Sequence, residues 1–323
     1  MLSAVVPVFK SIKNIEVMKY SEEFQYINLL WYAKKISTED SCTLLRSISD
    51  VMIYNLFQSR EINFRPSDLS SIFRNPNWYI YIKRLFNKGG EDCAKNITKK
   101  NILHIVTHNL YVSRDLIQKS FKDRLLMVEV ARDPIYMLKQ VKYNQDSHHG
   151  QNNPRHLGLV YKSTGLSLID GQKCFDDPTL DNWERAVNFL ERRIQHYIDS
   201  TKGVKKLDKS FPFFIFFEDF VKDPYPYLNE LITGFEITFN KNLKSFLKKE
   251  KLPREHQSDG RNLNIYKEIG WTKLRKEKND YNDIDCYLNH YKKIGVNHQC
   301  LKRLISLSEK YRDWKSSLIR NYI

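Results

Sequence analysis

The chain has 323 residues and a formal net charge of +15 at pH 7, with 41% hydrophobic and 28% charged residues. That length can bury a large core, and the composition is typical of a folded globular protein, which excludes the disordered and fibrous classes. The positive charge favours anionic partners, such as nucleic acid, an acidic membrane surface, or a phosphorylated or sulfated small molecule, and charge alone does not choose among them.

Short apolar runs alternate with helix-like segments along the chain. The runs, which we predict as strands covered on both faces, are at 27–33, 101–107, 124–131 and 211–217. The helix-like segments that follow them are at 43–58, 113–121, 134–145 and 223–235. This repeated order of strand and helix predicts a layered α/β domain with a parallel sheet and right-handed crossovers.

Two further regions have patterns of their own. Residues 145–180 are polar and interrupted by Gly and Pro, which predicts a long loop or lid. The segment 179–200 has apolar residues at three- and four-residue steps, as an amphipathic helix does. Lys-rich, helix-like segments close the chain. We predict a single domain over residues 1–323, with a helical C-terminal extension from about residue 276.

The spacing of the cysteines and the hydropathy of the chain indicate the cellular compartment of the protein. Five widely spaced cysteines fit neither a disulfide framework nor a zinc site, which favours a reducing compartment. No run of about 18 apolar residues predicts a membrane span, and the first residues lack the basic region and cleavage site of a signal peptide. We expect a soluble, cytoplasmic protein without a metal site; its oligomeric state is left open.

Two polar residues stand where apolar runs end. His108 follows the run at 101–107, and Arg132 follows the run at 124–131 and precedes Pro134, a residue favoured in the first turn of a helix. Ligands of open parallel sheets bind outside the carboxyl ends of the strands, so one site could include both side chains. The alternatives are a buried histidine bonded at a strand end, and an arginine paired with Asp133 or a surface carboxylate.

Several segments occur in an order that is known from one superfamily. They are "IVTHNLY", "LLMVEVARDPIYML", "FFIFFEDFVKDPYPYLNELITGFEI" and, more weakly, "YKEIGWTK". Over about residues 27–275 this order resembles the sulfotransferases that use 3′-phosphoadenosine 5′-phosphosulfate. The resemblance implies a three-layer α/β sandwich of the P-loop type, with a central, mainly parallel sheet. It also implies sulfuryl transfer to a hydroxyl or amine of a small-molecule, lipid or carbohydrate acceptor.

The resemblance implies a role for individual residues. His108 would be the general base, Arg132 would bind the 3′-phosphate of the donor, and Gln140 would assist Arg132. The other residues that it implies for donor binding or for the polar lining are Ser41, Thr43, Lys35, Phe217, Thr107, Lys267 and Trp271. A surface lysine and a core tryptophan are the alternatives for the last two. For Glu218 and Asp219 we expect capping of the next helix, or a pair with Lys222.

One segment departs from the family. "STEDSCT" (37–43) stands in place of the 5′-phosphosulfate loop, with Glu39 and Asp40 where a basic residue and Ser are usual. Because two carboxylates repel a phosphosulfate, the alternative function is a catalytically degenerate, sulfotransferase-like binding protein. A P-loop kinase is disfavoured because the chain lacks G-x-x-x-x-G-K-[ST], and a nucleic-acid binder because it contains no recognisable module.

Overall fold

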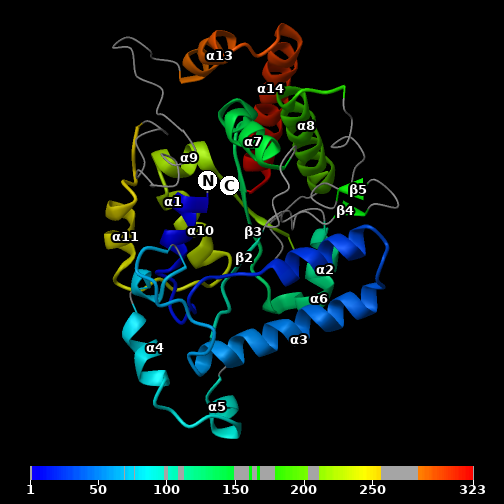
Figure 1. The fold of residues 1–323 in the computed structure, drawn as a ribbon. Helices are drawn as coiled ribbons and strands as arrows, with labels where there is room; N and C mark the ends of the chain where they lie inside the picture. Colours follow the sequence, from blue (N-terminus) through cyan, green and yellow to red (C-terminus); the bar gives the residue numbers. More distant parts are fainter. Residues whose placement is uncertain are drawn as a thin grey trace. The chain divides into compact units, whose positions relative to one another are not determined.

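The computed structural model describes residues 2–68, 70–75, 77–97, 101–107, 113–148, 160–161, 166–167, 179–202, 211–255 and 283–322. The chain divides into two compact units, coloured along the sequence in Figure 1. The first unit comprises residues 2–125 and 228–250, and the second comprises 126–227 and 251–323. Both are rich in helices and each contains a small parallel sheet, consistent with the α/β class. The single domain remains a prediction.

The first unit is built around a long helix. Its elements are α1 Leu2–Phe9, β1 Lys19–Tyr20, α2 Glu22–Tyr32, α3 Thr38–Phe57, η1 Ile72–Arg74, α4 Trp78–Arg84, α5 Glu91–Asn96, β2 Ile105–Val106, α6 Arg114–Phe121, η3 Lys122–Arg124 and α11 Leu243–Lys249. Helix α3 packs against α2 and α6, and their apolar residues form one core cluster that includes Phe24, Leu45 and Leu116. The predicted helices at 43–58 and 113–121 are thereby confirmed.

The strand predicted at 27–33 is wrong, because these residues belong to helix α2. Ser21 caps the helix by accepting a hydrogen bond from the backbone N–H of Phe24, and Glu22 and Glu23 occupy the first turn, where carboxylates are favourable. The buried side chains, among them Phe24, Ile27 and Asn28, recur at helical spacing. The aromatic run alone resembled a strand; the cap preceding it was the signal for a helix.

The strand predicted at 101–107 is confirmed in part. Only Ile105 and Val106 form β2, which pairs in parallel with β1 through Lys19↔Ile105 and Tyr20↔Val106. The sequence did not predict β1, since Lys19 and Tyr20 form a strand too short to show a hydrophobic pattern.

The second unit contains the two strands that were predicted best. Its elements are β3 Val128–Ala131, α7 Pro134–His148, β4 Val160–Tyr161, β5 Leu166–Ser167, α8 Asn182–Thr201, β6 Phe213–Phe216, α9 Phe217–Lys222, α13 Asp283–Lys293 and α14 His298–Tyr322, and α10 (Tyr225–Thr233) begins in this unit. Strands β3 and β6 pair in parallel, from Val128↔Phe213 to Ala131↔Phe216. The helices predicted at 134–145, 179–200 and 223–235 are confirmed as α7, α8 and α10.

Aromatic rings fill the core of the second unit. The indole of Trp314 on α14 stacks on Tyr197 of α8, with ring centroids 5.3 Å apart, and meets Phe214 and Phe216 of β6 edge-on at 5.4 Å. Its Nε1–H donates to the hydroxyl of Thr201, so the polar atom of a buried ring is satisfied. The end of the chain is helical, as predicted, and its last helix, α14, contributes Trp314 to this core.

The lid predicted at 145–180 lies mostly outside the described residues. Helix α7 continues to His148, and two residue pairs within the region, β4 and β5, form an antiparallel ladder. Among the described residues, every helix is too short or too polar to cross a bilayer.

Candidate functional site

Arg132 lies where β3 ends and α7 is about to begin, in the second unit. The pair Ala131↔Phe216 ends the β3–β6 ladder. Arg132 follows Ala131, Phe217 follows Phe216, and the two side chains lie against one another. The guanidinium carbon of Arg132 is 4.8 Å from the ring centroid of Phe217 and 5.5 Å from that of Tyr136. Two rings thus orient a cation whose side chain is 12% exposed.

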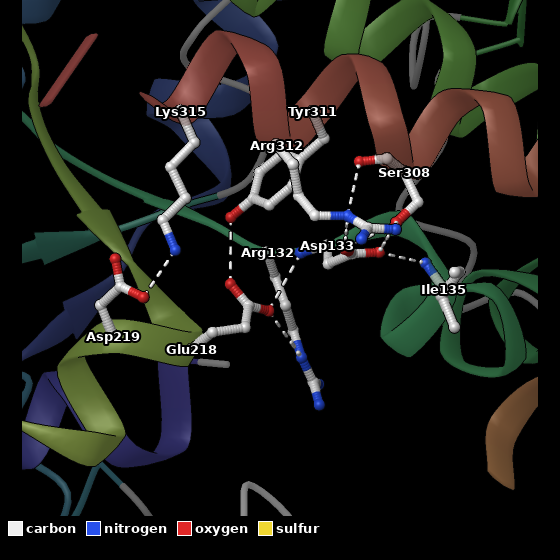
Figure 2. A network of polar contacts seen from close by, with 9 residues as sticks. All are labelled: Arg132, Asp133, Ile135, Glu218, Asp219, Ser308, Tyr311, Arg312 and Lys315. Carbon is white, nitrogen blue, oxygen red and sulfur yellow. Dashed lines mark hydrogen bonds and ion pairs between the residues drawn. The ribbon is translucent and has the colours of Figure 1, made fainter. Parts of the chain in front are cut away.

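The acidic partner of Arg132 is Glu218 on α9. The Nε of Arg132 is 3.9 Å from Oε1 of Glu218, and the Glu218 side chain is 13% exposed. Figure 2 shows that the far end of the guanidinium points away from Glu218 and from α14. Arg132 therefore forms an ion pair with a buried carboxylate, at a distance from Nε that is too long for a hydrogen bond.

Asp133 caps helix α7. Its Oδ1 accepts a hydrogen bond from the backbone N–H of Ile135 at 2.9 Å, and Pro134 occupies the first position of the helix, where a missing N–H costs nothing. The hydroxyl of Ser308 on α14 donates to Oδ2 at 2.7 Å, and Nε of Arg312 lies 3.7 Å from the same oxygen. Burial raises the pKa of the Asp133 carboxyl, and these partners offset part of that increase.

Glu218 connects three elements of the unit. Its Oε1 accepts from the backbone N–H of Asp133 at 3.0 Å, and its Oε2 accepts from the hydroxyl of Tyr311 on α14 at 3.0 Å (Figure 2). Burial raises the pKa of the Glu218 carboxyl, against the opposing effect of the Arg132 charge. The carboxylate holds the end of β3 to α9 and to α14.

The pair expected between Asp219 and Lys222 therefore needs correction. Asp219 does not pair with Lys222, since its Oδ1 accepts from Nζ of Lys315 on α14 at 2.5 Å. Both carboxylates lie in the first turn of α9 and bind residues of α14 that are 93 and 96 residues further along the chain. Such long-range partners cannot be read from the local pattern.

Replacement of Glu218 by glutamine is expected to change how stability depends on pH. A carboxyl whose pKa is raised by folding binds its proton more tightly in the folded state than in the unfolded state. Its contribution to the free energy of unfolding is therefore greatest below the unfolded pKa, near 4, and is lost as pH rises through the folded pKa. Urea unfolding of the wild type and of Glu218→Gln from pH 4 to pH 8 measures how the free energy of unfolding of each depends on pH. The wild type should lose stability relative to Glu218→Gln as pH rises; a difference independent of pH would contradict the raised pKa.

The residues that α14 contributes to this network were not predicted from the sequence. Ser308, Tyr311, Arg312 and Lys315 recur at steps of three and four residues, so they lie on one face of the helix (Figure 2). This polar stripe is visible in the sequence beside the apolar positions of the helix. The sequence does not show what the stripe binds, because its partners lie at the junction of β3, α7 and α9.

Gln140 lies on α7, two turns beyond Asp133, at a partly exposed position. Arg132, Gln140 and Phe217 thus all belong to the second unit. His108, Lys267 and Trp271 lie outside the described residues, so the distance between His108 and Arg132 stays a prediction. Thr107, just before His108, is described in the first unit, and its buried hydroxyl has no hydrogen-bond partner there.

The segment proposed as the donor loop forms the start of helix α3 and does not follow a strand. The Ser37 hydroxyl caps the helix by accepting from the N–H of Asp40 at 3.0 Å. Glu39 and Asp40 occupy the first turn, which the positive end of the helix dipole favours. Local helix geometry thus accounts for both carboxylates.

The three donor-binding candidates near this segment have different surroundings. Ser41 is fully buried, and its hydroxyl donates to the carbonyl of Ser37 at 2.6 Å. Thr43 is exposed on α3, and Lys35 is exposed in the turn before it. All three belong to the first unit, whereas Arg132 belongs to the second.

Among the described residues, no group of three or more His, Cys, Asp or Glu side chains could hold a metal ion. The group that the described site could offer to an anion is the Arg132 guanidinium, because the backbone N–H groups of Asp133 and Ile135 at the start of α7 already donate to Glu218 and Asp133. Comparison of the chain with protein-family models, with curated proteins and with solved structures gives no significant match.

Proposed function

We propose that the chain is a sulfotransferase that uses 3′-phosphoadenosine 5′-phosphosulfate. The acceptor would be a hydroxyl or amine of a small molecule, lipid or carbohydrate. One observation carries the proposal: Arg132 follows a buried parallel strand, stacks on Phe217 at the end of the neighbouring strand, and precedes the helix that Pro134 begins. The three-layer sandwich and a cytoplasmic location are proposed with it.

The residues of the chain would divide the work between binding and proton transfer. Arg132 would bind the 3′-phosphate with the amide of Gln140, and the Phe217 ring would keep the guanidinium in place. The donor supplies the sulfuryl group and a phosphate as leaving group. His108 would accept the acceptor's proton, since imidazole titrates near neutral pH. The unsatisfied Thr107 hydroxyl fits a polar ligand beside His108.

Lys35, Thr43, Lys267 and Trp271 would contribute charge, a hydroxyl and a ring to the donor, as the resemblance implies. Ser41 fits this role least well, because its hydroxyl already donates to Ser37 within α3.

A second candidate is a binding protein that has lost sulfuryl transfer. The observation that favours it is the start of α3, where Glu39 and Asp40 occupy the first turn. Carboxylates at the place of the phosphosulfate loop would weaken the binding of the transferring group while leaving the 3′-phosphate site at Arg132 intact.

The experiment that separates the candidates uses the purified full chain in two assays. Thermal unfolding with adenosine 3′,5′-bisphosphate reports nucleotide binding. Transfer of labelled sulfuryl groups to a panel of phenols, sugars and lipid acceptors reports catalysis, and His108→Ala should abolish transfer while nucleotide binding persists. Binding without transfer would favour the binding protein, and the absence of any stabilisation by the nucleotide would overturn both.

A further inference from the structure

A group of exposed apolar side chains lies on the first unit, around α4. Within the described part of the chain, exposed large apolar residues are scattered except between residues 64 and 86. The members of this group, which we call the aromatic patch, are Phe64, Phe73, Trp78, Tyr79, Leu85 and Phe86. Phe86 is 84% exposed and the others are 40–48% exposed. Exposed apolar residues that gather in this way mark interaction sites more often than single ones do.

Three rings of the aromatic patch are neighbours in space. The Phe73 ring centroid lies 6.4 Å from that of Phe64 and 5.7 Å from that of Trp78. The opposite face of α4 is fixed to the unit, since Tyr81 and Arg84 both bind the buried carboxylate of Glu16. Helix α4, beside the C-terminal end of α3 in Figure 1, therefore presents its aromatic face outward on a rigid base.

The segment that contains the aromatic patch is rich in positive charge. Residues 64–88 contain five Lys and Arg residues and one acidic residue, Asp68. Of the cations, Arg84 is paired with Glu16, whereas Arg65, Lys83 and Lys88 are exposed. The Lys83 ammonium lies 5.8 Å from the centroid of the Tyr79 ring, so charge and aromatic surface share one face.

We propose that the aromatic patch docks the protein on a membrane surface that carries anionic headgroups. Trp78 and Tyr79 have the side chains that favour the headgroup region, and Leu85 and Phe86 project far enough to enter the acyl boundary. Arg65, Lys83 and Lys88 would meet the negative headgroups. The protein would lie on the bilayer without crossing it. This docking does not depend on sulfuryl transfer.

Two other occupants fit the observations less well. A second copy of the chain would bring the same excess of positive charge against itself, which repels. Single-stranded nucleic acid stacks on rings that lie with one face against the protein, whereas Phe86 is exposed over most of its surface and Leu85 has no ring. A lipid surface accommodates both the projecting side chains and the charge.

Flotation of the purified full chain with lipid vesicles tests the proposal. The chain should float with phosphatidylcholine vesicles that contain phosphatidylserine and remain behind with phosphatidylcholine alone, and added salt should weaken the binding. Replacing both Leu85 and Phe86 by serine should weaken binding about a hundredfold, at about tenfold for each apolar side chain. Lys83→Glu should weaken it by about fivefold or more.

A matched control is Leu44→Ser with Val51→Ser. Both residues are exposed on α3 of the same unit, outside the patch, so these changes should leave flotation unchanged. Circular dichroism confirms that each variant is folded. Unchanged flotation of the Leu85/Phe86 variant would overturn the proposal, as would equal binding to neutral vesicles. A dimer, or a complex with single-stranded DNA, that requires Leu85 and Phe86 in the absence of vesicle binding would also overturn it.

Discussion

Arg132→Ala is expected to weaken the binding of adenosine 3′,5′-bisphosphate by about 2–5 kcal/mol, which at the upper end abolishes measurable binding. The guanidinium is oriented by Phe217 and Tyr136 and has a side chain only 12% exposed, so its contact with a phosphate would be screened little by water. A second arginine, Arg254, lies 6.0 Å from the centroid of the Phe217 ring, so the loss should be partial if Arg254 also contacts the phosphate. Isothermal titration calorimetry measures the loss.

Two further arginine variants distinguish a binding role from a structural one. Arg132→Lys keeps the charge and loses the planar fork, so it should bind the nucleotide with intermediate affinity. Arg303→Ala removes an arginine of the same unit that is bound to Glu191 at 2.6 Å, and it should leave the affinity unchanged. A folded Arg132→Ala protein that binds like the wild type would refute the assignment of the 3′-phosphate to this residue.

Arg84→Ala is expected to lower the free energy of unfolding of the first unit by about 3–5 kcal/mol. Arg84 donates two hydrogen bonds to the carboxylate of Glu16, at 2.8 and 3.0 Å, and Glu16 is 4% exposed. Tyr81 and Asn101 also donate to Glu16, but neither carries charge. Removal of the guanidinium would leave a buried carboxylate without its cation. Urea unfolding followed by circular dichroism measures the change.

Two comparisons test the cause of that loss. Replacing Arg84 and Glu16 together by methionine removes both charges, so it should restore most of the stability. Lys95→Ala breaks an exposed pair with Glu91 in the same unit, at 3.9 Å, and should have little effect because water screens both groups. A double variant as unstable as Arg84→Ala would show that packing of the arginine on Phe57 and Tyr81 matters more than the charge.

The candidate site was predictable where its determinants are local. The run before Phe217 is continuously apolar, the run before Arg132 is apolar except for Glu129, and both form strands. Pro134 at the first position of α7 was likewise readable, because its backbone geometry suits that place. The environment of Arg132 was not readable. Its carboxylate comes from Glu218, which is 86 residues further along the chain.

The first unit shows where local reading failed. The run at 27–33 is apolar and aromatic enough to resemble a strand, yet Ser21 and the glutamates after it begin a helix there. Glu39 and Asp40 looked like defects in a phosphate-binding loop, and the structure places them in the capped first turn of α3. In both cases the capping residue, and not the hydropathy, determined the element.

By itself, the sequence determined the α/β character, most of the helices, the two strands that end at Arg132 and Phe217, and the excess of positive charge. These follow from periodicity, caps and composition, which act over a few residues. Only the tertiary structure decided that α14 holds the β3, α7 and α9 junction through Ser308 and Tyr311, and that the aromatic patch around α4 stays exposed. The physical reason is that burial and pairing depend on side chains that are distant in sequence, whose positions no local pattern records.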